Sequence, residues 1–156
     1  MSFRVGIGVD AHAFTEGVPL VLGGVRFDFP RGLAGHSDGD VITHALIDAV
    51  LGAAGLGDIG SLFPSDGSTP QGISSLDLLQ DAVAQVREAG YSIVNADCVL
   101  IGEEPRIAAR RGELDQTLTS LVGAPVSVRA TTTDRLGFTG RGEGLAAQAV
   151  ALVERA

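Results

Sequence analysis

Residues 35–58 read GHSDGDVITHALIDAVLGAAGLGD, and they predict the helix around which the fold is built. Ser37 suits the N-cap, with Asp40 three residues later in a capping-box arrangement, and Gly55 favours a stop. The helix is therefore expected over residues 37–54. At about 100° per residue, apolar side chains recur along one side of it. This stripe comprises Ile42, Leu46, Ala49, Val50 and Ala53.

The same stretch gathers residues that can carry chemistry. It holds His36 and His44, and the only other histidine of the chain, His12, lies upstream. His44 and Asp48 are four residues apart and therefore lie on one side of the helix, away from the apolar stripe. The helix can bury its apolar side and still present an imidazole and a carboxylate, which favours a functional site.

Composition predicts one ordinary domain over residues 1–156, with 45% hydrophobic residues and a real core. The net charge of -8 argues against a partner that is nucleic acid or a membrane surface. An anionic ligand would then need metal ions, backbone amides or a few arginines. The single cysteine, Cys98, excludes an intrachain disulfide, suits a reducing cytoplasm, and lies in an apolar run typical of a buried thiol. Neither a signal peptide nor a membrane span is predicted, so a cytoplasmic location is expected.

Periodicity along the chain predicts both strands and helices. The expected elements are a strand at 3–10, a hairpin at 19–29 turning at Gly23–Gly24, a helix at 75–89, a strand at 91–101, a helix at 105–122 opened by Pro105, and a strand at 125–132. Residues 57–73 form a long loop, for which a mobile lid or substrate loop is the natural interpretation. The tail at 143–156 suits a helix by its alanines and a buried strand by its alternation, so both stay open.

Asp10, His12 and His44 form a candidate metal set. Asp10 and His12 are two apart at a strand end, so extended backbone points both to one side. Two histidines and a carboxylate with a fourth position open are typical of catalytic zinc. Ordinary turn capping and a solvated helix face are the alternatives. Asp48 or Asp40 could orient the imidazole from outside the set.

Two further segments favour anions. His36 and Ser37 precede the helix, where free backbone amides and the helix dipole attract anions, although simple capping explains Ser37 equally well. Residues 131–134 read TTTD and enter a glycine-rich segment at 137–144, which suits phosphate with a hard cation such as magnesium. A threonine-rich strand followed by a turn is the alternative there. Arg141 can bind phosphate or pair with Glu143.

Taken together, the motifs resemble one family in order and spacing. They are DAH at 10–12, GHSDGD at 35–40, HAL at 44–46, GLGDIG at 55–60, FP at 63–64, and ATTT at 130–133 continuing to Gly144. The chain closely resembles the 2-C-methyl-D-erythritol 2,4-cyclodiphosphate synthases of the non-mevalonate isoprenoid pathway. The resemblance implies an α/β (α+β) domain with a mixed four-stranded sheet and helices on one face, assembled as a chorismate-mutase-like homotrimer with active sites at subunit interfaces. It also implies that the tail is a strand.

The resemblance further implies an enzyme, a phosphorus–oxygen lyase. The 2-phosphate of 4-diphosphocytidyl-2-C-methyl-D-erythritol 2-phosphate would attack the β-phosphorus, and CMP would leave as the cyclic diphosphate closes. Two alternatives remain: a metal-dependent phosphohydrolase, and a non-catalytic metal-stabilised trimer that binds nucleotides or isoprenoid phosphates.

By the same resemblance, Asp10, His12 and His44 would hold Zn²⁺ or another divalent transition metal, and Asp134 would hold Mg²⁺ or Mn²⁺ with the diphosphate. His36 and Thr132 would act in catalysis. Substrate contacts would come from Asp10, His12, His36, Ser37, Asp58, Gly60, Gly102, Pro105, Arg106, Thr131, Thr132, Thr133, Asp134, Phe138 and Arg141. An isoprenoid-phosphate effector is implied for the threefold cavity near Phe138 and Arg141.

Some positions depart from the family pattern. Asp134 stands where glutamate is frequent, and Arg106 replaces a lysine. Glu103 and Glu104 precede that arginine, so their carboxylates are expected to point away from a diphosphate. Residues 65–67 and Gln71 also differ, which leaves the contacts of the 65–73 loop open.

Overall fold

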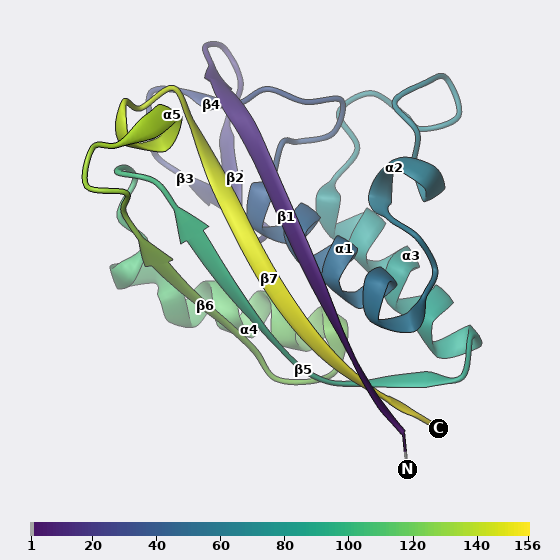
Figure 1. Ribbon diagram of the computed structural model, residues 1–156. Coiled ribbons are helices and arrows are strands. Elements are labelled where there is room, and N and C mark those ends of the chain that lie inside the picture. The colour runs from purple at the N-terminus through teal and green to yellow at the C-terminus, as the bar shows by residue number, and fades with distance from the viewer. Residues whose placement is uncertain (1) are drawn as a thin grey trace.

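The computed structural model describes residues 2–156 and shows a mixed sheet with helices packed on one face (Figure 1). The elements are β1 (Phe3–Thr15), β2 (Leu20–Leu22), β3 (Val25–Phe27), β4 (Gly32–Leu33), α1 (Val41–Ala54), α2 (Ile59–Leu62), α3 (Ser75–Glu88), β5 (Tyr91–Ile101), the 3₁₀ turn η1 (Ala108–Arg110), α4 (Arg111–Val122), β6 (Val126–Thr131), α5 (Gly137–Gly140) and β7 (Gly144–Arg155). No helix within the described part of the chain has the length and apolar character needed to cross a membrane.

The sheet runs in the order β4-β1-β7-β5-β6, with β5 and β6 parallel and the other neighbours antiparallel. The four long strands agree with the predicted four-stranded sheet, and the two-residue β4 extends it at one edge. The tail is the central strand β7, so the strand alternative is correct. Its alternate residues 145–153 are buried under the helices, because they lie on one face of the strand.

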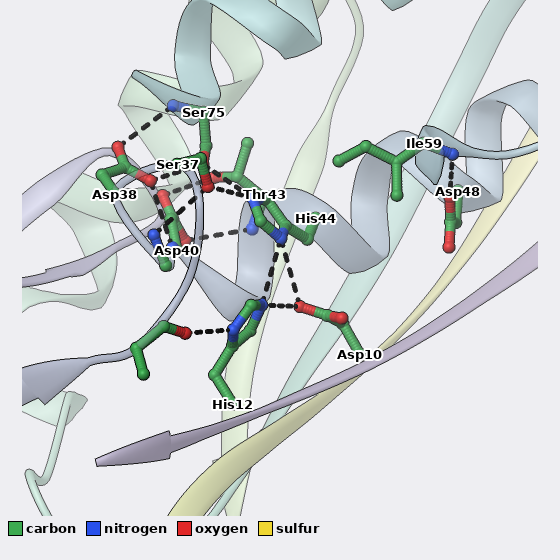
Figure 2. Close-up of polar contacts among 12 residues, drawn as sticks. Asp10, His12, Ser37, Asp38, Asp40, Thr43, His44, Asp48, Ile59 and Ser75 are labelled. Carbon is green, nitrogen blue, oxygen red and sulfur yellow. Dashed lines mark hydrogen bonds and ion pairs between the residues drawn. The ribbon is translucent and has the colours of Figure 1, made fainter. Parts of the chain in front are cut away.

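The strand β1 packs backbone to backbone against α1. A Cβ at Gly8 would lie 1.9 Å from the Ala45 carbonyl oxygen, and a Cβ at Gly6 would lie 2.1 Å from the Ala49 carbonyl oxygen. Only glycine permits this approach. Asp10 and His12 continue the same side of the strand and so face the start of α1 (Figure 2). The larger apolar residues of β1 point the other way and are exposed: Phe3, Val5, Ile7 and Val9.

The helix α1 begins four residues later than predicted. Asp40, and not Ser37, is its N-cap, and its fully buried carboxylate accepts hydrogen bonds from four donors. These are Gly23 N at 2.8 Å, Gly24 N at 2.7 Å, Thr43 N at 3.1 Å and Thr43 Oγ1 at 2.7 Å. The carboxylate thus ties the β2–β3 turn to the helix start, a long-range role that sequence spacing does not reveal. Gly55 ends α1 with φ 73°, as predicted.

The strand β1 continues to Thr15, past its predicted end at residue 10, so Asp10 and His12 lie within it. The remaining boundaries are mostly close to the prediction. The helix α3 ends within one residue of its predicted end. The helix predicted from Pro105 is wrong at its start, since α4 begins at Arg111 after the turn η1. Ile107 is buried and draws the preceding segment into the core instead of a first helical turn. The 57–73 loop contains one short helix, α2, which Asp58 caps in a capping box. Its role as a lid stays a prediction.

Cys98 is fully buried on β5, as predicted, and burial raises the pKa of its thiol to about 12. Because the thiolate is the reactive form, we expect a thiol reagent at pH 8 to label the native protein at least about a thousandfold more slowly than free cysteine. The same reagent should label the protein rapidly in denaturant. Rapid labelling of the native protein would contradict the burial.

Candidate functional site

The strand β1 and the first turn of α1 bring Asp10, His12 and His44 together, as predicted (Figure 2). His12 Nε2 lies 2.7 Å from Asp10 Oδ2, and His44 Nδ1 lies 3.3 Å from the same oxygen. The two imidazole nitrogens are 3.2 Å apart. Three potential ligand atoms therefore converge on one point, from segments separated by 32 residues.

This geometry fits a divalent cation. Tetrahedral sites with bonds of about 2.0–2.1 Å place neighbouring ligand atoms about 3.3 Å apart. The His12 Nδ1–H group donates to the Ala34 carbonyl at 2.6 Å, so the lone pair of Nε2 is directed at the centre. Asp10 Oδ2 is buried, and among the described residues it lies near the two imidazole nitrogens without accepting a hydrogen bond of good geometry. A buried carboxylate oxygen without a hydrogen-bond donor is what a bound cation would compensate.

The charge state of the set also suits a metal. Burial by itself would raise the pKa of the Asp10 carboxyl, but the two imidazoles outweigh it and the pKa is lowered. Asp10 is therefore ionised at neutral pH. In the metal-free chain, the Asp10 carboxylate raises the pKa of His12. A proton and a cation consequently compete for the same nitrogen.

The residues predicted to orient His44 are not the ones that do so. Asp48 Oδ1 accepts a hydrogen bond from Ile59 N at 2.8 Å and points away from the imidazole (Figure 2), and Asp40 caps the helix. Instead, the hydroxyls of Ser37 and Ser75 each lie 2.9 Å from His44 Nε2. Ser75 was missed because it is 31 residues away, at the start of α3, and no local pattern marks it.

A cavity of about 210 Å³ opens beside the metal set. Its lining includes His36, Ser37 and Gly60 from the predicted substrate residues. The His36 Nε2–H group donates to the Thr69 carbonyl at 2.6 Å, which ties the 57–73 loop to the segment before α1. Asp58 lies outside the lining, because its carboxylate accepts the Ser61 N–H at 2.8 Å and caps α2. Its substrate role stays a prediction.

A larger cavity, of about 700 Å³, lies at the ends of β5 and β6. The predicted residues that line it are Arg106, Thr132, Asp134 and Arg141. Glu103 and Glu104 line it as well, although their carboxylates were expected to point away. The predicted Gly102, Pro105, Thr131, Thr133 and Phe138 belong to the same segments without contributing to the lining. No described residue lines both cavities, so the predicted site is divided in two on a single chain.

The turn after β6 has an unusual backbone. Asp134 and Arg135 have φ of 51° and 65°, which non-glycine residues rarely adopt. Glu103 Oε1 accepts the Arg135 N–H at 2.9 Å and so holds this turn, a role that sequence reasoning missed. Arg141 pairs with Glu143 at 2.7 Å, the structural alternative considered for it.

Fold and site together define a class: an α/β protein with a two-histidine, one-carboxylate metal set beside cavities lined by polar residues. The YgbB family matches residues 3–154, and the chain belongs to this family. It is 52% identical to the 2-C-methyl-D-erythritol 2,4-cyclodiphosphate synthase of Rubrobacter xylanophilus, over 99% of this chain and 96% of the relative.

Solved structures agree with this assignment. The bifunctional IspDF of Campylobacter jejuni superposes with a TM-score of 0.95 at 37% identity, covering 99% of this chain and 43% of that one. The IspF of Plasmodium falciparum, solved as a CDP complex, gives a TM-score of 0.85 at 29% identity, covering 99% and 97%. The α/β class and the arrangement of the sheet expected from the sequence are confirmed.

Proposed function

We propose that the protein converts 4-diphosphocytidyl-2-C-methyl-D-erythritol 2-phosphate to 2-C-methyl-D-erythritol 2,4-cyclodiphosphate and CMP. An oxygen of the 2-phosphate forms a bond to the β-phosphorus, and the bond from that phosphorus to the CMP oxygen breaks. No water is consumed, so the reaction is of the lyase type. The observation that carries the proposal is the convergence of Asp10, His12 and His44, with the buried Asp10 Oδ2 left without a hydrogen bond, in a chain of this family.

In this proposal the three side chains would hold zinc or another divalent transition metal. The cation, when bound, would neutralise phosphate charge and polarise the phosphoryl group as a Lewis acid. His36 and Ser37 line the adjoining cavity and would position the methylerythritol phosphate. Because Thr69 holds His36 Nε2, its Nδ1 remains available to the substrate. The chain has a net charge of -8, so metal ions are needed to attract a polyanion.

The larger cavity would receive the cytidine diphosphate. Asp134 would hold Mg²⁺ or Mn²⁺, and the Thr132 hydroxyl would steady the transferring phosphoryl group. Arg106 supplies positive charge in the same cavity. Glu103 Oε1 accepts the Arg135 N–H and would keep the turn after β6, which carries Asp134, in place. The isoprenoid-phosphate effector implied near Phe138 and Arg141 stays a prediction.

The active site would be completed by a homotrimer. The helix-free face of the sheet carries exposed apolar side chains, with Val5 at 67%, Ile7 at 60% and Val9 at 62% exposure. Val150 pairs with Ile7 and adds to the same surface. Contiguous apolar surface of this kind is normally covered by a partner. In such an assembly, the cavity beside the metal set of one subunit would meet the larger cavity of its neighbour. Within one chain no described residue lines both cavities.

A substitution on this face tests the trimer. We expect Ile7→Asp to convert the trimer, of three times 15.9 kDa, into single chains in solution and to remove activity. In the trimer the new carboxylate would be buried at the interface without an opposite charge, which is unfavourable. Light scattering coupled to size exclusion measures this. Val18→Asp, at an exposed turn outside the face, is the matched control and should stay trimeric. A wild-type monomer with full activity would contradict the trimer.

The reaction itself is tested by incubating the purified protein with the cytidylylated substrate, Zn²⁺ and Mg²⁺. We expect CMP and the cyclic diphosphate in equal amounts by ³¹P NMR and chromatography. A linear phosphate product containing oxygen from water would favour the phosphohydrolase. Binding of metal and CDP without any turnover would favour the non-catalytic trimer.

A further inference from the structure

Behind the metal set, a carboxylate, a hydroxyl and an imidazole form a chain of contacts (Figure 2). Ser75 Oγ lies 2.9 Å from His44 Nε2 and makes a short hydrogen bond to Asp38 Oδ1. The Asp38 carboxylate also accepts the Ser75 N–H at 3.0 Å through Oδ2. The Asp38 carboxylate therefore accepts hydrogen bonds from both the backbone N–H and the hydroxyl of Ser75.

The donors and acceptors in this chain fix where the protons lie. A carboxylate only accepts, so the single hydroxyl hydrogen of Ser75 points to Asp38. Ser75 Oγ can therefore only accept a hydrogen bond from His44 Nε2. The ring hydrogen of His44 must then lie on Nε2. In a neutral imidazole the other nitrogen, Nδ1, is left with a free lone pair. This nitrogen lies 3.3 Å from Asp10 Oδ2. Its lone pair and the carboxylate oxygen would repel each other, and a cation shared between them would remove that repulsion.

The arrangement is buried and held from several sides. Ser75 is fully buried at the first position of α3. Asp38 N donates to the Ile73 carbonyl at 3.1 Å, and Asp38 Oδ1 also accepts the Asp40 N–H at 3.1 Å. The contacts join the segment before α1 to the start of α3. The hydroxyl consequently cannot turn away from Asp38 without breaking contacts in the interior.

Ser37 does not make the same selection. Its hydroxyl also lies 2.9 Å from His44 Nε2, but its oxygen contacts no carboxylate within the described residues. Its hydrogen is therefore free to rotate, and it can accept from an N–H or donate to a bare nitrogen. Ser37 tolerates both tautomers of His44, whereas Ser75 with Asp38 permits one.

We propose that Asp38 and Ser75 are positioning residues that hold His44 as its Nε2–H tautomer and so present Nδ1 to the metal. The inference rests on the proposed metal site and deepens it. Ligating histidines depend on such partners for orientation and basicity, and loss of a partner typically weakens metal binding by about 10- to 100-fold. Neither Asp38 nor Ser75 contacts substrate in this role; both act through His44.

Zinc affinity gives the first test, measured with Zn²⁺ alone against a chromophoric chelator. We expect Ser75→Ala and Asp38→Ala, which leaves no acceptor for the Ser75 hydroxyl, each to weaken binding by about 10- to 100-fold. The double variant should bind zinc only slightly more weakly than either single variant, because both residues act through the same imidazole of His44. Ser74→Ala is the matched control. It removes the N-cap of the same helix, whose side chain accepts Leu76 N, but it leaves the Ser75 hydroxyl in place.

The tautomer gives a second test that a merely structural role would not move. Imidazole ¹⁵N shifts of the zinc-loaded protein can be assigned because the chain has only three histidines. We expect the hydrogen on Nε2 of His44 in the wild type and in Ser74→Ala, and a mixture of forms in Ser75→Ala and Asp38→Ala. The folded state of each variant is checked by circular dichroism, and Asp38→Ala serves if Ser75→Ala does not fold.

The outcomes separate this inference from the proposed function. If the wild type binds zinc tightly while the variants keep both its affinity and its tautomer, the positioning role is overturned and the metal site stands. An Nδ1–H form at His44 in the zinc-loaded wild type would also overturn the positioning role. If wild type and His44→Ala bind zinc equally weakly, the metal-based function itself fails.

Discussion

Replacing His44 by alanine is expected to abolish turnover and to leave the chain folded and assembled. The imidazole is one of the three side chains of the candidate metal set, and its loss would remove both a proposed metal ligand and the partner of two serine hydroxyls. Where charge on a transferring phosphoryl group must be neutralised, losing the cation should lower kcat by at least about a thousandfold. Product formation from the cytidylylated substrate, bound zinc per chain and mass in solution are the three measurements.

The matched control for His44→Ala lies one turn further along the same helix. Asp48→Asn keeps an oxygen for the Ile59 N–H and should retain zinc and activity, since this side chain points away from the set. If His44→Ala instead unfolds or loses its assembly, the metal is structural. The non-catalytic alternative would then be favoured over the enzyme.

Gly8→Ala is expected to destabilise the protein severely. Its new Cβ would meet the Ala45 carbonyl oxygen at 1.9 Å and the Ala49 nitrogen at 2.8 Å. Both are backbone atoms of α1, so no side chain can rotate away, and strand and helix must separate. Overpacking usually costs about 1–3 kcal/mol, and a backbone clash lies at or above that range. This is a large part of a typical 5–15 kcal/mol free energy of unfolding.

The same substitution should also weaken zinc binding, because it moves the strand that carries Asp10 away from the helix that carries His44. Urea unfolding and chelator competition measure the two effects. Gly112→Ala is the control, since a Cβ there meets no atom within 4 Å and the residue lies in α4. If the urea concentration at the midpoint of unfolding is the same for Gly8→Ala as for the wild type, β1 does not pack this closely on α1.

Features set by neighbouring residues were predictable. Gly55 ends α1, the Gly23–Gly24 turn joins two strands, and β5 has its predicted bounds. In each case a capping residue, a turn residue or a short periodic run decides the outcome. The metal set was also predicted from Asp10, His12 and His44, since strand geometry and a helix side bring those groups to the right faces.

Predictions failed where distant segments compete for the same group. The spacing of Ser37 and Asp40 matches a capping box. In the structure, however, the Asp40 carboxylate accepts hydrogen bonds from the amides of the β2–β3 turn, and Asp40 itself is the N-cap of α1. Pro105 suits a first helical turn, yet the chain turns Ile107 into the core before α4 begins. The exposed faces of β1 show the same principle. Alternation identifies the strand, but not which of its faces meets the helix.

The sequence by itself therefore determined most of the elements and the candidate metal set, and the resemblance of its motifs to one family implied the class of fold. The elements and the candidate set follow from capping, periodicity and the chemistry of histidine beside aspartate. Only the tertiary structure decided that the glycine face of β1 is the packed one and that Ser75, hydrogen-bonded to Asp38, lies against His44. The reason is physical: those contacts depend on how closely β1, α1 and α3 approach one another, and that distance is set by the packing of the whole core.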